Sequence, residues 1–299
     1  MNESAINSNG ITPKKSRAAR KMRRFFRVLF ARKLVVLCTI VLGIMALGAI
    51  FAPFVAPFNP YAQNLANSLA PASSTNILGT DMLGRDVLSR IIYGTRVSFS
   101  VGIVSVAFSG LIGMLLGVIS GVVGGVVDSF IMRVMDAMLA IPLIILAMFL
   151  GSVIGQGLGN VMLAVGIAMI PSYARLTRGQ VLTIREMDYV TAGTIFGASK
   201  FRNAMSHIVP NCISPNIVLM TMNLGGAILA EANLSFLGLG INPPTASWGA
   251  MVSDGFMFLT MHPIIAIAPG IFILLIVLCF NIVGDAVRDA LDPRLRGTF

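Results

Sequence analysis

Five long stretches without a charged residue constrain this chain more than any other feature of its sequence. Each exceeds the roughly 18 to 20 residues that a helix needs to cross a bilayer. Only 11% of the 299 residues are charged, whereas about a quarter are charged in soluble domains. The sequence therefore predicts an all-α integral membrane protein. The stretches cover residues 34–55, 97–127, 137–174, 203–230 and 255–284.

The stretch at residues 137–174 is too long for a single crossing. As one helix it would run about 57 Å at 1.5 Å per residue, whereas the hydrocarbon core is about 30 Å thick. Breaker residues gather between two apolar blocks at residues 151–160, among them Gly155, Gly157 and Asn160. We therefore expect a turn there and six transmembrane helices in all.

Lysine and arginine are distributed unevenly between the two predicted sides. If the N-terminus is cytoplasmic, six crossings place the loop at residues 175–202 and the C-terminus there too. Nineteen of the 22 basic residues then lie inside, and Arg85, Arg90 and Arg96 lie outside. This follows the positive-inside rule and explains the net charge of +10 without nucleic acid as a partner. The basic run at residues 14–33 orients the first helix and meets anionic lipid; an RNA-binding arm is the alternative.

The chain divides into four parts. Residues 1–33 form a basic cytoplasmic tail that starts with a polar, disordered segment and ends in an interfacial helix. Residues 34–95 form the first transmembrane helix and an external loop. Residues 96–284 form the core domain of five transmembrane helices with the cytoplasmic loop at residues 185–210, and residues 285–299 form a cytoplasmic tail. The interfacial helix is indicated by apolar residues at helical spacing: Phe25, Phe26, Leu29 and Phe30.

Two connections carry residues of note. Residues 121–136 are expected to form a short inside turn, in which Arg133 can reach Asp128 or Asp136 at helical spacing. On the outside, two consecutive prolines forbid a continuous helix between the last two crossings. The lone tryptophan, Trp248, follows them and suits the membrane interface.

The cytoplasmic segment at residues 185–210 contains two short amphipathic patterns separated by Gly197. Glycine adopts a positive φ easily, so one helix can end there and the next can turn back. Pro210 then stops or kinks the second helix where the fifth crossing begins. The result is a compact helical hairpin whose displacement would move the membrane helix attached to it. From periodicity alone, an ordinary helix-turn-helix loop that happens to be amphipathic fits equally well.

The spacing of this segment resembles the loop of binding-protein-dependent ABC permeases. That loop reads Glu-Ala-Ala, three residues, Gly, nine residues, Ile, one residue, Leu-Pro. Ala192, Gly197 and Pro210 match it strictly. The departures leave open whether a carboxylate contact to the ATPase exists, or whether Asp188 or Glu186 replaces the missing glutamate. They are Thr191 for Glu, Gly193 for Ala, His207 for Ile and Val209 for Leu.

Further segments look like the second permease of dipeptide and oligopeptide importers, and the resemblance covers roughly residues 30–296. It implies a type I ABC importer permease fold in a bacterial cytoplasmic (inner) membrane. The segments are at residues 78–90 (LGTDMLGRDVLSR), 124–128 (GGVVD), 132–136 (MRVMD), 140–142 (AIP), 175–178 (RLTR), 188–192 (DYVTA), 234–240 (LSFLGLG) and 281–293 (NIVGDAVRDALDP).

The resemblance also implies partners. They are a second, homologous permease, two cytoplasmic ATPase subunits and an extracytoplasmic solute-binding protein. Membrane lipid is a further expected partner. ATP and magnesium would be bound by the ATPase subunits, and this chain would bind no cofactor. Short peptides are the expected substrate, with nickel chelates, glutathione or antimicrobial peptides as alternatives. The residues expected to couple to the ATPase are Asp188, Tyr189, Val190, Thr191, Ala192, Gly193, Gly197, Ala198, Ser199 and Pro210.

Four outer residues are candidates for contact with substrate or binding protein. Arg85 and Asp86 either make such contacts or form a local ion pair that anchors their loop. Glu231 lies near the outer end of the fifth crossing, where a carboxylate is costly and often functional. It either meets a peptide amino terminus or bonds to the backbone of the adjacent bend. Trp248 is the fourth candidate.

Other function classes find little support in the sequence. The crossings contain no nucleophile with a general base beside it, no paired aspartates and no H-E-x-x-H metal site. No catalytic residue is therefore expected. The sequence has no Walker G-x-x-x-x-G-K-[ST] motif, so ATP hydrolysis would be supplied by other subunits. His207 and His262 lie on opposite predicted sides, so a shared metal site is not expected. A passive channel fits the hydropathy but leaves the hairpin unexplained.

Overall fold

The computed structural model describes residue 22 and residues 25–291. In these residues the chain is helical, with one isolated β-bridge between Thr80 and Asp86 and no sheet. The expected disorder of residues 1–13, most of the basic run and the C-terminal tail beyond residue 291 lie outside the described residues.

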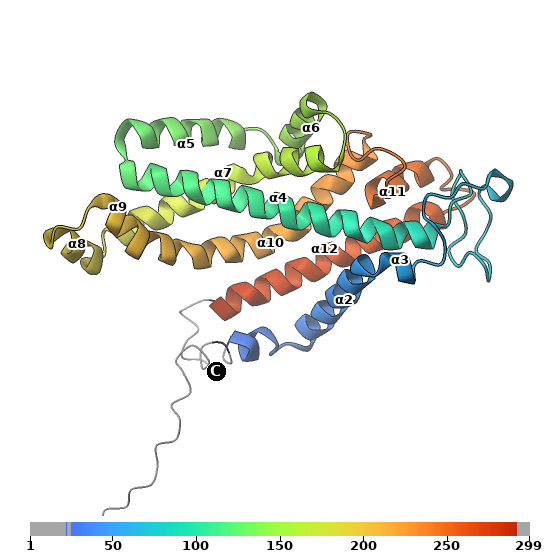
Figure 1. The fold of residues 1–299 in the computed structure, drawn as a ribbon, viewed down its shortest axis with the longest axis horizontal. Helices are drawn as coiled ribbons and strands as arrows, with labels where there is room; N and C mark the ends of the chain where they lie inside the picture. The colour runs from blue at the N-terminus through green and yellow to red at the C-terminus, as the bar shows by residue number, and fades with distance from the viewer. Residues whose placement is uncertain (1–21, 23–24, 292–299) are drawn as a thin grey trace, which may run out of the picture.

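Five helices in the described part are long and apolar enough to cross a membrane. Most lie side by side in one elongated bundle (Figure 1). A sixth crossing is made if the bent pair α5 (Gly125–Leu139) and α6 (Leu143–Ile154) counts as one span. The five are α2 (Lys33–Ile50), α4 (Val87–Val123), α7 (Leu158–Arg185), α10 (Val209–Phe236) with the short helices before it, and α12 (Ile264–Leu291).

The bent pair corrects the expected third crossing. The segment predicted as an inside turn is helical from Gly125, and the straight helix predicted after it is broken at residues 140–142, where the axes differ by 96°. Pro142 caps α6 with an extended backbone because its ring cannot continue the preceding helix. The turn after α6 is confirmed, and Gly155 and Gly157 have φ values of 96° and 132° there.

Helices α4 and α7 pack closely along their length because glycines on α4 face α7. A Cβ atom at Gly113 would lie 2.5 Å from Cβ of Tyr173, and one at Gly117 would lie 2.5 Å from the carbonyl oxygen of Ala174. Small residues four positions apart let two membrane helices approach at backbone distance. The two helices run in the same direction, and α5 and α6 lead the chain back from the end of α4 to the start of α7 along one edge of the molecule (Figure 1).

The two ends of the bundle differ. At one end lie the short helices α8 (Asp188–Ile195) and α9 (Lys200–Asn203). At the other end lie α3 (Ala52–Val55), the 3₁₀ turn Leu65–Asn67, a long loop and α11 (Trp248–Phe256). The described N-terminal part, residues 25–29, is helical and packs through Leu29 on Ala286 of α12. Arg32 pairs with Asp289 at 3.3 Å beside it.

Candidate functional site

A helical hairpin projects from the bundle between α7 and α10, as the sequence predicts (Figure 1). Helix α8 ends at Ile195, and Gly197 turns the chain with φ of 83°. Its amide donates to the carbonyl oxygen of Thr194 at 3.0 Å. Ser199 caps α9 by accepting from the amide of Arg202 at 3.2 Å. A serine cap and a left-handed glycine thus set both sides of the turn.

One buried asparagine joins the two arms of the hairpin. The side-chain amide of Asn203 donates to Oγ1 of Thr194 at 3.0 Å and to the carbonyl oxygen of Val190 at 3.5 Å. A Cβ atom at Gly193 would lie 2.8 Å from Oδ1 of Asn203, so a larger residue there would push the asparagine side chain aside. Sequence reasoning missed Asn203, because an asparagine inside a helical pattern gives no sign of its partners.

The hairpin is continuous with the membrane helix α10. The chain remains helical from α9 through a π-helical turn, η2 (Ala204–Ile208), into α10. Pro210, expected to stop or kink the helix, lies in the first turn of α10. It lacks an amide hydrogen, and the wider π-turn before it accommodates the lost hydrogen bond without ending the helix. A displacement of the hairpin therefore reaches α10 through an unbroken helical segment.

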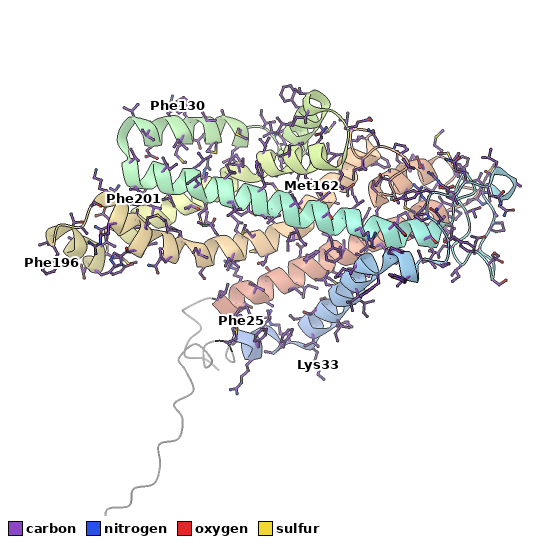
Figure 2. The ribbon with its side chains drawn as sticks, in the orientation of Figure 1. Phe25, Lys33, Phe130, Met162, Phe196 and Phe201 are labelled. Carbon is purple, nitrogen blue, oxygen red and sulfur yellow. The ribbon has the colours of Figure 1, made fainter. Side chains whose placement is uncertain are left out.

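The tip of the hairpin exposes large apolar side chains. Ile195 is 78% exposed, Phe196 is 89% exposed and Phe201 is 74% exposed. Figure 2 shows Phe196 at the end of the hairpin farthest from the bundle. Exposed apolar surface of this kind marks an interaction site. Ile195 and Phe196 lie within residues 188–199, the segment expected to couple to the ATPase, although neither was singled out, and Phe201 lies just beyond it.

The expected coupling residues divide by exposure. Val190 is buried against Ile208 and Cys212 and holds α8 to the bundle. The exposed members are Asp188, Tyr189, Thr191, Gly197, Ser199 and Pro210, and the half-buried ones are Ala192, Gly193 and Ala198. Of the two candidate carboxylates, Glu186 pairs with Arg185 at 3.0 Å. Asp188 lies in the first turn of α8, where the helix dipole stabilises a carboxylate.

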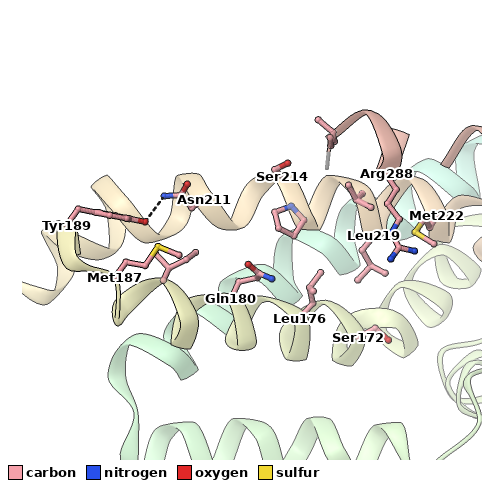
Figure 3. Close-up of a pocket in the computed structure, with 14 residues that line it drawn as sticks. Ser172, Leu176, Gln180, Met187, Tyr189, Asn211, Ser214, Leu219, Met222 and Arg288 are labelled. Carbon is pink, nitrogen blue, oxygen red and sulfur yellow. Dashed lines mark hydrogen bonds between the residues drawn. The ribbon is translucent and has the colours of Figure 1, made fainter. Parts of the chain in front are cut away.

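Next to the hairpin, an open groove of about 890 Å³ lies along α7, α10 and the end of α12. Figure 3 shows Tyr189 and Asn211 toward one end, and Arg288 of α12 toward the other. Among the described residues that line the groove, Arg288 alone is charged. The lining comprises Ser172, Leu176, Gln180, Ile184, Met187, Tyr189, Asn211, Ser214, Pro215, Val218, Leu219, Met222, Arg288 and Leu291.

Comparison with known proteins decides the family. The profile of the binding-protein-dependent transport system inner membrane component matches residues 113–297. The chain belongs to this family. The N-terminal transmembrane domain of oligopeptide transport permease C matches residues 21–72 of the permease.

Curated relatives cover most of the permease. It is 44% identical over 88% of its length to the probable D,D-dipeptide transport system permease protein DdpC of Escherichia coli (strain K12), covering 89% of that protein. It is 47% identical to the dipeptide transport system permease protein DppC of the same organism, covering 83% of this chain and 85% of that protein. The di/tripeptide transport system permease protein DppC of Pseudomonas aeruginosa (strain UCBPP-PA14) is 43% identical, with 83% and 84% covered. The chain is thus an inner-membrane permease subunit of a binding-protein-dependent transport system.

In this permease Arg85 and Asp86 hold the outer loop together. Both are only 4% exposed. Nε of Arg85 donates to Oδ2 of Asp81 at 2.6 Å. Oδ2 of Asp86 caps α4 by accepting from the amide and the hydroxyl of Ser89 at 2.8 and 2.7 Å. Asn76 donates to the other oxygen of Asp86 at 2.8 Å. Both residues therefore anchor the loop, Arg85 through an ion pair with Asp81 and Asp86 through hydrogen bonds, rather than by pairing with each other.

The side chain of Trp248, expected to suit the membrane interface, is fully buried inside the protein. Its Nε1 donates to the carbonyl oxygen of Ile91 at 3.0 Å, and a Cβ atom at Gly94 would lie 2.7 Å from the indole ring. The absence of a side chain at Gly94 makes room for the ring. Trp248 therefore locks α11 onto the outer end of α4.

Glu231 is also fully buried. Its Oε1 accepts from the hydroxyl of Ser235 at 2.8 Å, one turn further along α10. The other oxygen, Oε2, has no partner among the described residues. The carboxyl group has no exposed surface from which to meet a peptide, and a side chain rather than the expected backbone group is its partner.

The ion pairs of the opposite end differ from those expected. Arg178 of α7 binds Asp128 through two bonds of 2.5 and 2.6 Å, and Ser120 donates to the same carboxylate. Arg175 binds Asp136 at 2.5 Å. Arg133, predicted to pair within α5, is exposed and takes neither carboxylate. The two pairs clamp α5 to α7 instead.

Proposed function

We propose that this permease forms half of the translocation path of an ATP-driven importer of short peptides. A second homologous permease would supply the other half, two ATPase subunits would bind ATP and magnesium, and an extracytoplasmic binding protein would deliver the substrate. The peptide substrate is supported by the names of the relatives, which are dipeptide or di/tripeptide permeases. The hairpin is the single observation that carries the ATP-driven mechanism.

The hairpin has the properties that a coupling element needs. Its apolar tip, formed by Ile195, Phe196 and Phe201, would be buried in a groove of the ATPase. Full burial of one such side chain contributes about 1.5–3 kcal/mol. Its internal hydrogen bonds through Asn203 keep the two arms together. Closure of the ATPase dimer would then move the hairpin as a unit.

The movement has a direct route to the substrate path. Helix α10 continues from the hairpin and forms one wall of the groove, and Tyr189 of α8 lines the same groove. A shift of α8 and α9 would therefore change the separation of α7 and α10. Alternation between an open and a closed groove is a rigid-body transition of the kind that drives transport.

Replacement of Phe196 by serine tests the coupling contact. Phe196 is 89% exposed, so the change leaves the fold of the permease intact. We expect the variant to bind the ATPase subunits roughly 10- to 100-fold more weakly, from the lost burial of one aromatic side chain. ATP-dependent uptake in proteoliposomes should fall in parallel.

The matched control is Met261→Ser, because Met261 is 79% exposed at the opposite end of the molecule. This variant should retain the ATPase subunits. Equal retention of the ATPase subunits by Phe196→Ser and the wild type would refute the proposed contact.

A further inference from the structure

We propose that Arg288 binds the C-terminal carboxylate of the passing peptide in the groove between α7 and α10. This inference rests on the proposed function and assigns a ligand group to one residue. Arg288 lies in the last turn of α12, and its guanidinium group points into the groove beside Leu219 and Met222 (Figure 3).

The described lining of the groove carries positive charge and no negative charge. No aspartate or glutamate is among the described residues that line it, and the polar lining is otherwise neutral: Ser172, Gln180, Tyr189, Asn211 and Ser214. Within the described residues no ion pair engages Arg288, whereas its neighbour Asp289 is paired with Arg32 at 3.3 Å. The groove therefore offers a site for an anionic group and no matching site for a cationic one.

A guanidinium group suits this task because its N–H donors match the two oxygens of a carboxylate. Apart from Arg288, the lining is apolar or neutral, so side chains of different peptides are tolerated. The C-terminal carboxylate is the anionic group that unmodified peptides share. The volume of about 890 Å³ lies in the range of small-molecule sites.

A position near a helix C-terminus also stabilises a basic residue through the helix dipole. If stabilisation of the helix were the only role of Arg288, uptake would not depend on whether the peptide ends in a free acid or an amide. The two roles therefore separate when peptides with different termini are compared.

The test uses the complete importer in proteoliposomes with its binding protein. Uptake of dialanine, its C-terminal amide and its N-acetyl derivative is measured per loaded binding protein, with each peptide at a saturating concentration. Displacement of labelled dialanine from the purified complex without binding protein provides a second comparison, free of selection by that protein.

The wild type should transport the free acid about tenfold faster than the amide, which lacks the charge-assisted bond. It should accept the N-acetyl derivative as well as dialanine. Arg288→Gln should lower uptake and binding of the free acid to the level of the amide and leave the amide unchanged. Arg288→Lys should restore part of the preference. Arg133→Gln, a change at an exposed arginine of α5, is the matched control and should behave as the wild type.

An equal loss for acid and amide in Arg288→Gln would overturn the proposal and leave a structural role. Unchanged uptake of both would overturn it as well. Loss of the second permease from the purified Arg288→Gln complex would show that the groove is a subunit interface. If the wild type shows no ATP-driven uptake of any peptide, the proposed function itself fails.

Discussion

Replacement of Trp248 by alanine should strongly destabilise the permease. The side chain is the largest of those that are fully buried, and it packs against Gly94 and Phe272. Truncation of a buried aromatic side chain costs about 3–5 kcal/mol, which includes the hydrogen bond to Ile91. For a large domain, each kcal/mol lowers the melting temperature by about 2–4 °C. The expected decrease is therefore about 6–20 °C.

A second substitution tests the geometry of this contact. Gly94→Ala places a Cβ atom 2.7 Å from the indole ring, and such overpacking costs about 1–3 kcal/mol. Because the nearest atoms belong to Trp248, Gly94→Ala should have little effect in the Trp248→Ala background. The double variant should thus be more stable than the sum of the single changes predicts.

Melting can be followed with a thiol-reactive dye, because the three cysteines are free and buried. The dye allows the same assay for variants that lack tryptophan. Met257→Ala, a change at a residue that is 84% exposed just after α11, is the control and should melt as the wild type. A Trp248→Ala variant that melts within about 2 °C of the wild type, well below the expected decrease, would refute the packing argument. So would strict additivity with Gly94→Ala.

Three further predictions concern single residues. Gly197→Val should reduce uptake more than Gly197→Asn, because the positive φ costs a residue with a Cβ atom about 1–2 kcal/mol and asparagine tolerates it best; equal uptake would contradict this. Asp128→Asn should lower the melting temperature because it weakens two bonds to Arg178, whereas Asp136→Asn, in an exposed pair, should change it little. A larger decrease in melting temperature for Asp136→Asn than for Asp128→Asn would contradict this. Burial raises the pKa of Asp254 despite the attraction of nearby arginines, so its contribution to stability falls as pH rises above about 4. Asp254→Asn should flatten the curve of melting temperature against pH in that range, and an unchanged slope would count against it.

The sequence predicted those features that depend on local patterns. Charge-free length identified the crossings, and the glycines near residue 155 located the turn between α6 and α7. The two helical patterns around Gly197 identified the hairpin, because amphipathic spacing and a glycine with positive φ are local properties. The role of this hairpin toward an ATPase remains a prediction.

Features that depend on contacts between distant segments were missed. Arg133 has the right spacing for Asp128, but Arg178 of α7 takes that carboxylate because α5 packs on α7. Hydropathy treats residues 137–151 as continuous and does not detect the break that Pro142 allows. The sequence also contained no sign that Trp248 is fully buried, because the space for its ring is provided by Gly94 of a distant helix. Each outcome was decided by a partner more than 30 positions away, or by a proline whose effect hydropathy ignores.

The central claim is that this permease works as part of an ATP-driven complex. The most direct measurement is purification of the tagged permease from its native membrane in mild detergent, with mass spectrometry of the proteins retained. We expect a second permease and ATPase subunits with Walker motifs. Recovery of the permease alone, together with ion conductance after reconstitution, would contradict the account and indicate a channel.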